Sequence, residues 1–128
     1  MKYFKLEEML RTGTNLPNVP TWEVVDNLRA LIENVLIPAR EALGAPIHVN
    51  SGYRSPEVNK AVGGAKNSQH VLGEAADLTT GTKEGNKLLF QALLKVAMFD
   101  QLIDEKDFSW IHVSFRKGKN RLEVLKIA

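Results

Sequence analysis

The chain has 128 residues, of which 44% are hydrophobic, so it is long enough to bury a core as one domain. Its 17 basic and 15 acidic residues leave a net charge of +2, which is too weak to favour a nucleic-acid-binding protein. The absence of cysteine excludes disulfides, thiolate metal sites and a thiol nucleophile. A bound metal must therefore have nitrogen and oxygen ligands, which favours zinc or a similar divalent ion.

The amino-terminal residues 1–8 mix charged and apolar side chains and lack the long apolar core of a signal peptide. No stretch approaches the roughly 18 apolar residues of a membrane span. We therefore expect a monomeric protein that is made in the cytoplasm without an export signal.

The first third of the chain is predicted to be helical. A turn-rich segment at residues 12–20 joins a short helix to a long one. Thr21 suits the N-cap of the long helix, apolar residues then recur at helical spacing as far as Leu43, and Gly44 suits the stop. Pro38 lies inside this run and should kink the helix or divide it in two.

The middle of the chain alternates between short regular elements and a long loop. Residues 47–50 have strand character, and the polar segment 51–74 that follows is rich in turn formers, with one short helix at about 56–62. Long ordered loops of this kind are usually functional. A buried strand is expected over 75–78 and a helix over 83–98. The inner face of that helix should carry Leu88, Leu89, Ala92, Leu93 and Val96.

Three consecutive strands are predicted at the carboxyl end, over residues 101–105, 110–115 and 122–127. Helices followed by a mostly antiparallel sheet are typical of an α+β domain, and residues 1–128 should form one such domain. The basic segment Arg116–Arg121 lies between two of the strands. It is either a solvated hairpin turn or a polyanion-binding loop.

Two histidines and one aspartate have the pattern of an open metal site. His70 lies in a polar, glycine-bearing loop, and Asp77 follows seven positions later on the predicted strand, beside small Ala75 on the same face. A buried carboxylate among small apolar residues needs a partner, and a cation satisfies it. His112 lies on the polar face of a later strand. Three ligands leave one position of a tetrahedral zinc ion open, as in catalytic zinc sites.

Other signatures of hydrolases are missing. The sequence has no His-Glu-x-x-His helix, no Gly-x-Ser-x-Gly elbow and no phosphate-binding glycine loop. The third histidine, His48, is expected to be structural or exposed, with a supporting contact to a metal ligand as the alternative.

The residues around the proposed ligands form a motif. It consists of Ser68, His70, Gly73, Ala75 and Asp77, with Trp110 and His112 downstream. This motif resembles the zinc D-Ala-D-Ala carboxypeptidase family of peptidoglycan peptidases, in the group that also holds the hedgehog signalling domain. The segments 51–55 and 99–103 are similar to the compact phage and bacterial branch of the family. The resemblance implies a zinc ion bound by His70, Asp77 and His112, and cleavage of a peptide bond in the stem peptide.

One position departs from the pattern of this family. Many relatives carry an acidic catalytic base three positions before the last histidine, where this chain has Ser109. Serine is not an acid and cannot serve as this base. The acids nearby are Asp104, Glu105 and Asp107.

The pairing of the predicted strands selects among these acids. If Ile103 lies opposite His112, Glu105 falls on the same sheet face as His112 and is the predicted base. A register shifted by one residue would favour Asp104 instead. Asp107, in the turn, is the next candidate, and solvated charge without a catalytic role is the remaining alternative.

Four further residues have candidate roles. Arg54 is the candidate cation for stabilising the oxyanion or holding a substrate carboxylate, and a solvent-facing arginine in a turn is the alternative. Ser68 is expected either to bind substrate or to cap its loop. Tyr53 and Trp110 either line the pocket or fill the core.

The resemblance implies a zinc-dependent hydrolase, first of all a D-Ala-D-Ala carboxypeptidase. In the expected mechanism, zinc lowers the pKa of a water and Glu105, selected by the strand pairing, removes its proton. One alternative is an endopeptidase of the endolysin type, which cuts within the stem peptide or a cross-bridge. The other is a non-catalytic, zinc-stabilised module that binds the cell wall, which Ser109 keeps open. Because no export signal accompanies this chemistry, we expect an enzyme of phage or prophage type that reaches the wall after release.

Overall fold

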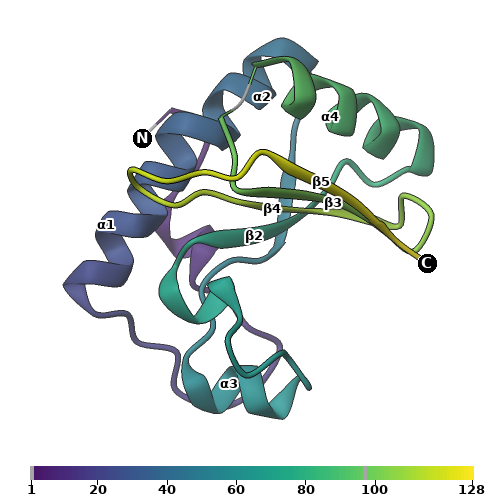
Figure 1. Cartoon of the computed structure of the whole chain (residues 1–128). Helices are drawn as coiled ribbons and strands as arrows, with labels where there is room; N and C mark the ends of the chain where they lie inside the picture. Colours follow the sequence, from purple (N-terminus) through teal and green to yellow (C-terminus); the bar gives the residue numbers. More distant parts are fainter. Residues whose placement is uncertain (1, 97) are drawn as a thin grey trace.

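Helices cover one face of a five-stranded sheet in the computed structural model, which describes residues 2–96 and 98–128 (Figure 1). The predicted α+β class is confirmed. In chain order the elements are η1 (Leu6–Met9), α1 (Trp22–Leu31), η2 (Ile32–Leu36), α2 (Ile37–Leu43), β1 (His48–Ser51), α3 (Pro56–Ala61), η3 (Gln69–Leu72), β2 (Ala75–Thr79), α4 (Lys83–Val96), β3 (Gln101–Glu105), β4 (Trp110–Ser114) and β5 (Glu123–Ile127).

The sheet has the strand order β1-β2-β4-β3-β5, and every pair is antiparallel except β3 with β5. His112 on β4 lies opposite Asp77 on β2 and opposite Ile103 on β3. The predicted register of β3 and β4 is therefore confirmed. Because directly paired residues share a face of the sheet, Asp77 and His112 point to the same side.

The long amino-terminal helix is divided, as predicted from Pro38. Thr21 caps its start, with Oγ1 accepting a hydrogen bond from the Val24 amide at 3.2 Å. A π-helical turn, η2, follows α1, and the amide of Ile37 donates to the Ile32 carbonyl. Pro38 has no amide hydrogen to donate, so the wider turn and the new start at α2 accommodate it.

The core lies between the helices and the inner face of the sheet. The apolar stripe predicted for the long helix is confirmed at its centre, where five side chains have no exposed surface: Leu28, Leu31, Ile32, Val35 and Ala39. The sheet contributes Leu78, Leu102, Ile111 and Val113, which are also fully buried. These strand residues alternate with the polar ones, so the polar row lies on the opposite face.

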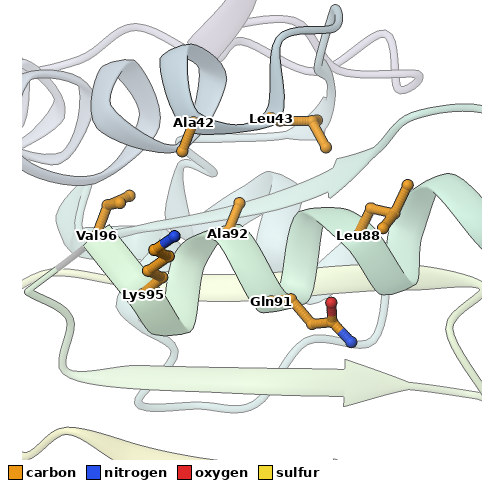
Figure 2. A pocket seen from close by; sticks show the side chains of 7 residues that line it. All are labelled: Ala42, Leu43, Leu88, Gln91, Ala92, Lys95 and Val96. Atoms are coloured by element: carbon orange, nitrogen blue, oxygen red, sulfur yellow. The ribbon is translucent and has the colours of Figure 1, made fainter.

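The predicted inner face of α4 is wrong at two positions. Leu89, Ala92 and Leu93 are buried, but Leu88 and Val96 are 58% and 40% exposed. Both line a surface pocket of about 370 Å³ between α2 and α4 (Figure 2). The periodicity of a sequence predicts the centre of a buried stripe better than its edges. Whether a residue at the edge is buried depends on where the neighbouring helix packs. The helix ends at Val96, and residue 97 of the predicted helix lies outside the described residues.

The predicted hairpin turn at Arg116–Arg121 is also wrong. Both edges of β4 are occupied, by β2 and β3, so β5 cannot pair with it. The chain instead crosses over, and β5 pairs in parallel with the free edge of β3.

Within the described part of the chain, no helix is long and apolar enough to cross a membrane.

Candidate metal centre

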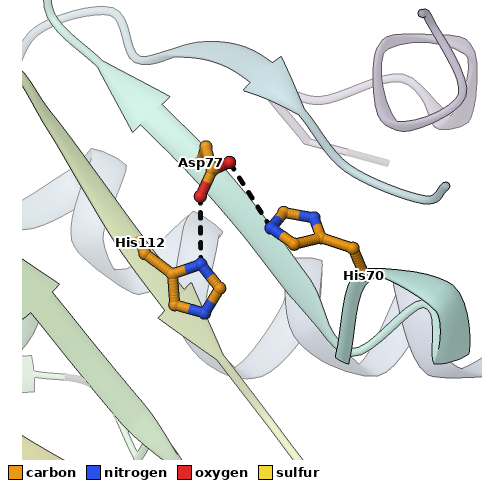
Figure 3. Close-up of side chains that lie close together, drawn as sticks. All are labelled: His70, Asp77 and His112. Atoms are coloured by element: carbon orange, nitrogen blue, oxygen red, sulfur yellow. Dashed lines mark hydrogen bonds and ion pairs between the residues drawn. The ribbon is translucent and has the colours of Figure 1, made fainter. Parts of the chain in front are cut away.

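Three side chains converge on the face of the sheet opposite the core: His70, Asp77 and His112 (Figure 3). His112 Nδ1 lies 3.0 Å from Asp77 Oδ1, and His70 Nε2 lies 3.4 Å from Asp77 Oδ2. One nitrogen or oxygen atom from each residue lies within 4.8 Å of the others. The structure therefore brings together the three residues that the sequence predicts as metal ligands.

Local structure positions each of the three residues. Asp77 and His112 are direct partners on the neighbouring strands β2 and β4. His70 comes from η3, a single turn capped at its start by Ser68, whose Oγ accepts from the His70 amide at 3.2 Å. Gly73 ends this turn in the left-handed conformation, with φ of 74°, which glycine adopts without steric cost.

The His70 ring is held by a backbone carbonyl. Its Nδ1 lies 2.7 Å from the oxygen of Gly52. A carbonyl oxygen only accepts hydrogen bonds, so Nδ1 carries a proton, and Nε2, on the side of Asp77, is the ring nitrogen left to bind a metal. Histidines that bind metals are commonly oriented in this way, by a hydrogen bond from the second ring nitrogen.

Asp77 is a carboxylate at neutral pH. Its burial acts to raise its pKa, but hydrogen bonds and charge interactions with His112 and His70 outweigh burial and hold the pKa below its usual value. Two ring nitrogens and a carboxylate make the kind of donor set that zinc prefers. The residues present therefore fit a zinc ion.

Arg54 completes the surroundings of Asp77, since Nη2 lies 3.3 Å from Asp77 Oδ2. The guanidinium also donates to Ser51 Oγ at 3.1 Å and to Asn59 Oδ1 at 3.4 Å. The Arg54 amide donates to the His70 carbonyl at 3.0 Å. With its side chain 18% exposed, Arg54 is not the solvent-facing arginine of the alternative interpretation.

Glu105 lies on the same face as the three side chains. It pairs with Trp110, two residues before His112, and is half-buried. Burial raises the pKa of Glu105, the charge of Asp77 also raises it, and His112 opposes the rise. A carboxyl group with a raised pKa is better suited to exchanging protons near neutral pH.

The other two acids have structural contacts. Asp104 pairs with Ile111 on the core face, and its Oδ1 accepts from the Phe108 amide at 2.6 Å, which holds the turn between β3 and β4. Asp107 lies in that turn, 65% exposed, with its carboxylate 2.6 Å from Lys83 Nζ. The structure does not bring either carboxylate to the cluster.

The remaining candidates divide between the site and the core. Ser68 caps η3, and Tyr53 is buried among core residues. Trp110 is half-buried on the site face of β4, with Lys106 Nζ 5.5 Å from the centre of its ring. Trp110 is therefore better placed than Tyr53 to contact a substrate.

Two contacts of the site are missing from the sequence-based prediction: Gly52 with His70, and Arg54 with Asp77. Each joins residues about twenty positions apart, and no local sequence pattern predicts a contact between residues at this separation. His48 is exposed on the edge strand β1, as expected.

Known proteins are similar to this chain in the region that carries these residues. The sequence profile of the peptidase M15 family matches residues 2–114, which include all three converging side chains. A segment of 45 residues is 53% identical to a zinc D-Ala-D-Ala carboxypeptidase of Streptomyces albus G. That segment is 34% of this chain and 18% of the relative, so the match spans less than one fifth of the relative's length.

Proposed function

The chain belongs to the peptidase M15 family, and we propose that it is a zinc-dependent peptidase whose metal is held by His70, Asp77 and His112. The observation that carries this proposal is the convergence of two imidazoles on one half-buried carboxylate, with the His70 ring fixed by the Gly52 carbonyl. Three protein ligands leave a further position for water, as in catalytic zinc sites.

A bound zinc ion supplies a water of lowered pKa and polarises the scissile carbonyl. We propose Glu105 as the general base that accepts the proton of this water and passes it to the leaving amine. Its place on the face of His112 and its raised pKa both support this role.

Arg54 is the proposed electrostatic partner of the substrate. Its guanidinium is held beside Asp77 by Ser51 and Asn59, so it is already oriented before a substrate arrives. A guanidinium fixed in this way suits the carboxylate of a peptide terminus or the developing oxyanion. Trp110 would form an apolar wall beside it, whereas Ser68 supports His70 and Tyr53 supports the core.

We propose the peptidoglycan stem peptide as the substrate, and the bond before a terminal D-Ala as the bond cleaved, so that the enzyme acts at the bacterial cell wall. The relative from Streptomyces albus G carries this activity in its name. The motif around His70 and Asp77 supports the same substrate by resemblance.

Digestion of a stem pentapeptide ending in D-Ala-D-Ala tests this proposal. We expect zinc-loaded protein to release free D-Ala, identified by mass, and to leave the same peptide intact when its terminal carboxylate is amidated. Equal cleavage of both peptides would instead identify an endopeptidase. Binding to purified peptidoglycan without any product, from zinc-loaded protein, would contradict a catalytic function.

A further inference from the structure

A second polar cluster lies on the other side of the turn that carries His70. Its centre is Asp100, a carboxylate with no exposed surface. Arg121 donates to Asp100 Oδ1 from its amide and from Nε, both at 2.9 Å, and to Oδ2 from Nη2 at 2.8 Å. Gln69 Nε2 donates to the same Oδ2 at 3.0 Å.

Gln69 also connects this cluster to the turn η3. It is the first residue of the turn and directly precedes His70. Its Nε2 donates to Glu74 Oε1 at 3.3 Å, and its carbonyl accepts from the Glu74 amide at 3.0 Å. Glu74 Oε1 in turn lies 3.5 Å from Arg116 Nε. The turn is thus closed between Gln69, which is joined to Arg121 through Asp100, and Glu74, which contacts Arg116 directly.

An isolated turn of four residues is not stable by itself, because nucleating a helix fixes many dihedral angles for few hydrogen bonds. The position of His70 must therefore come from contacts outside η3. One side is held by the contacts of His70 with Gly52 and with the Arg54 amide. The cluster around Asp100 holds the other side through Gln69.

We propose that Asp100, Arg121 and Gln69 act as positioning residues that hold His70 in place for metal binding. This inference rests on the proposed function, since it requires that His70 binds zinc. It assigns a role to the segment 115–128, which lies beyond the part of the chain matched by the family profile. The ion pair joins that segment to the metal centre.

The same contacts explain the basic segment Arg116–Arg121. Its two arginines pair with the buried acids Glu74 and Asp100, so the positive charges of the arginines are compensated within the molecule. Lys117 and Lys119 are exposed, and their side chains make no hydrogen bond or ion pair with the residues that the structure describes. They offer matched controls in the same loop.

The test measures the zinc dissociation constant by competition with a chromophoric chelator. The variants are Gln69→Met, which keeps the length of the side chain but removes its donor, Arg121→Ala, Arg121→Lys and the control Lys119→Ala. We expect the first two to bind zinc on the order of 10-fold more weakly, as for other groups that orient metal ligands. Arg121→Lys should recover part of the loss, and Lys119→Ala should match the wild type.

The absorption spectrum of the cobalt-substituted protein and the unfolding temperature of the metal-free protein separate positioning from stability. We expect a changed cobalt spectrum in Gln69→Met, because the imidazole of His70 is displaced. Wild-type zinc affinity and spectrum in Gln69→Met would overturn the inference, even if its unfolding temperature falls. Gln69→Met decides the question if Arg121→Ala does not fold. A wild type that binds no zinc would refute the proposed function itself.

Discussion

Glu105 differs from its two acidic neighbours in the face of the sheet that it occupies. Asp104 points to the core side and holds a turn, and Asp107 pairs with Lys83 on the surface. Glu105 shares the face of His112, and the charges of His112 and Asp77 act on its pKa. The proposed chemistry therefore depends on a single carboxylate of the three.

Replacing Glu105 by Gln should reduce kcat by about 10²- to 10⁴-fold, the usual contribution of a general base. Zinc content should stay at the wild-type level, because Glu105 is not one of the proposed ligands. The matched control is Asp107→Asn in the same hairpin. An exposed ion pair such as Asp107 with Lys83 contributes little to stability, so this variant should keep its activity. Equal activity in both variants would remove Glu105 from the mechanism.

The pairing of Asp100 with Arg121 should make stability depend on acid pH. Hydrogen bonds from Arg121 lower the pKa of Asp100 from 3.8 to about 2, against the opposing effect of its burial. The unfolded chain therefore binds the proton first as the pH falls, so the contribution of Asp100 is complete above its unfolded pKa and is lost toward pH 2.

Urea unfolding at several values between pH 5 and pH 2 measures this dependence. The wild type should lose more stability over this range than Asp100→Asn, whose side chain does not titrate. Part of the loss should remain in the variant, because the pKa of Asp77 is also lowered. Parallel profiles for the two proteins would show that Asp100 does not contribute as described.

The sequence identifies a residue well where its local surroundings are unusual. His70, Asp77 and His112 each interrupt a pattern of small, apolar or glycine residues, and the alternation of two strands is enough to place Glu105 on the face of His112. The sequence around the residues that contact them shows no such unusual pattern. Gly52 and Arg121 act through contacts that exist only once distant segments have folded together.

At the scale of elements, the approach of β1 to η1 places the Gly52 carbonyl beside His70. The Tyr53 amide donates to the Met9 carbonyl at 2.7 Å, which brings the two backbones together. A Cβ atom at Gly52 would lie 2.5 Å from the Met9 oxygen, and this neighbour is backbone that cannot rotate away. Only glycine fits here without displacing an element.

Gly52→Ala should therefore destabilise the fold by about 1–3 kcal/mol, as overpacking commonly does, and should weaken zinc binding as the carbonyl moves from His70. Gly13→Ala is the matched control, since a Cβ atom there has no neighbour within 4 Å. Chemical denaturation and zinc titration of the two variants measure both effects. If Gly52→Ala matches Gly13→Ala in both, the close approach has no energetic consequence.

Only one of the two pairings of β3 could be predicted from the sequence. The register of β3 and β4 follows from matching polar faces across a short turn, and it is confirmed. The pairing of β5 depends on which strand edges are already occupied, and neighbouring positions in the sequence do not reveal this. The same holds for Leu88 and Val96, whose exposure depends on where α2 lies.

At the scale of the whole molecule, the proposed ligands join η3 and β2, which are consecutive in the chain, to the distant strand β4. A ligand that binds only the folded state stabilises it by mass action, by about 2.7 kcal/mol at a free concentration 100-fold above its dissociation constant. The helical layer on the other face does not contribute to the site but supplies many of the core side chains.

Zinc should therefore raise the thermal unfolding temperature, and a strong chelator should reverse the increase. Asp77→Asn should show little response to zinc, because the weaker amide oxygen replaces the central carboxylate. Differential scanning calorimetry with and without the metal measures both effects. An equal response in wild type and Asp77→Asn would place the stabilising metal elsewhere.

The most direct test of the account is the zinc content of the purified protein, measured by elemental mass spectrometry beside His70→Ala and the exposed-histidine control His48→Ala. We predict about one zinc ion per chain in the wild type and in His48→Ala, as for a single three-ligand site, and little in His70→Ala. A wild type that takes up no zinc, or a His70→Ala variant that keeps it, would contradict the account.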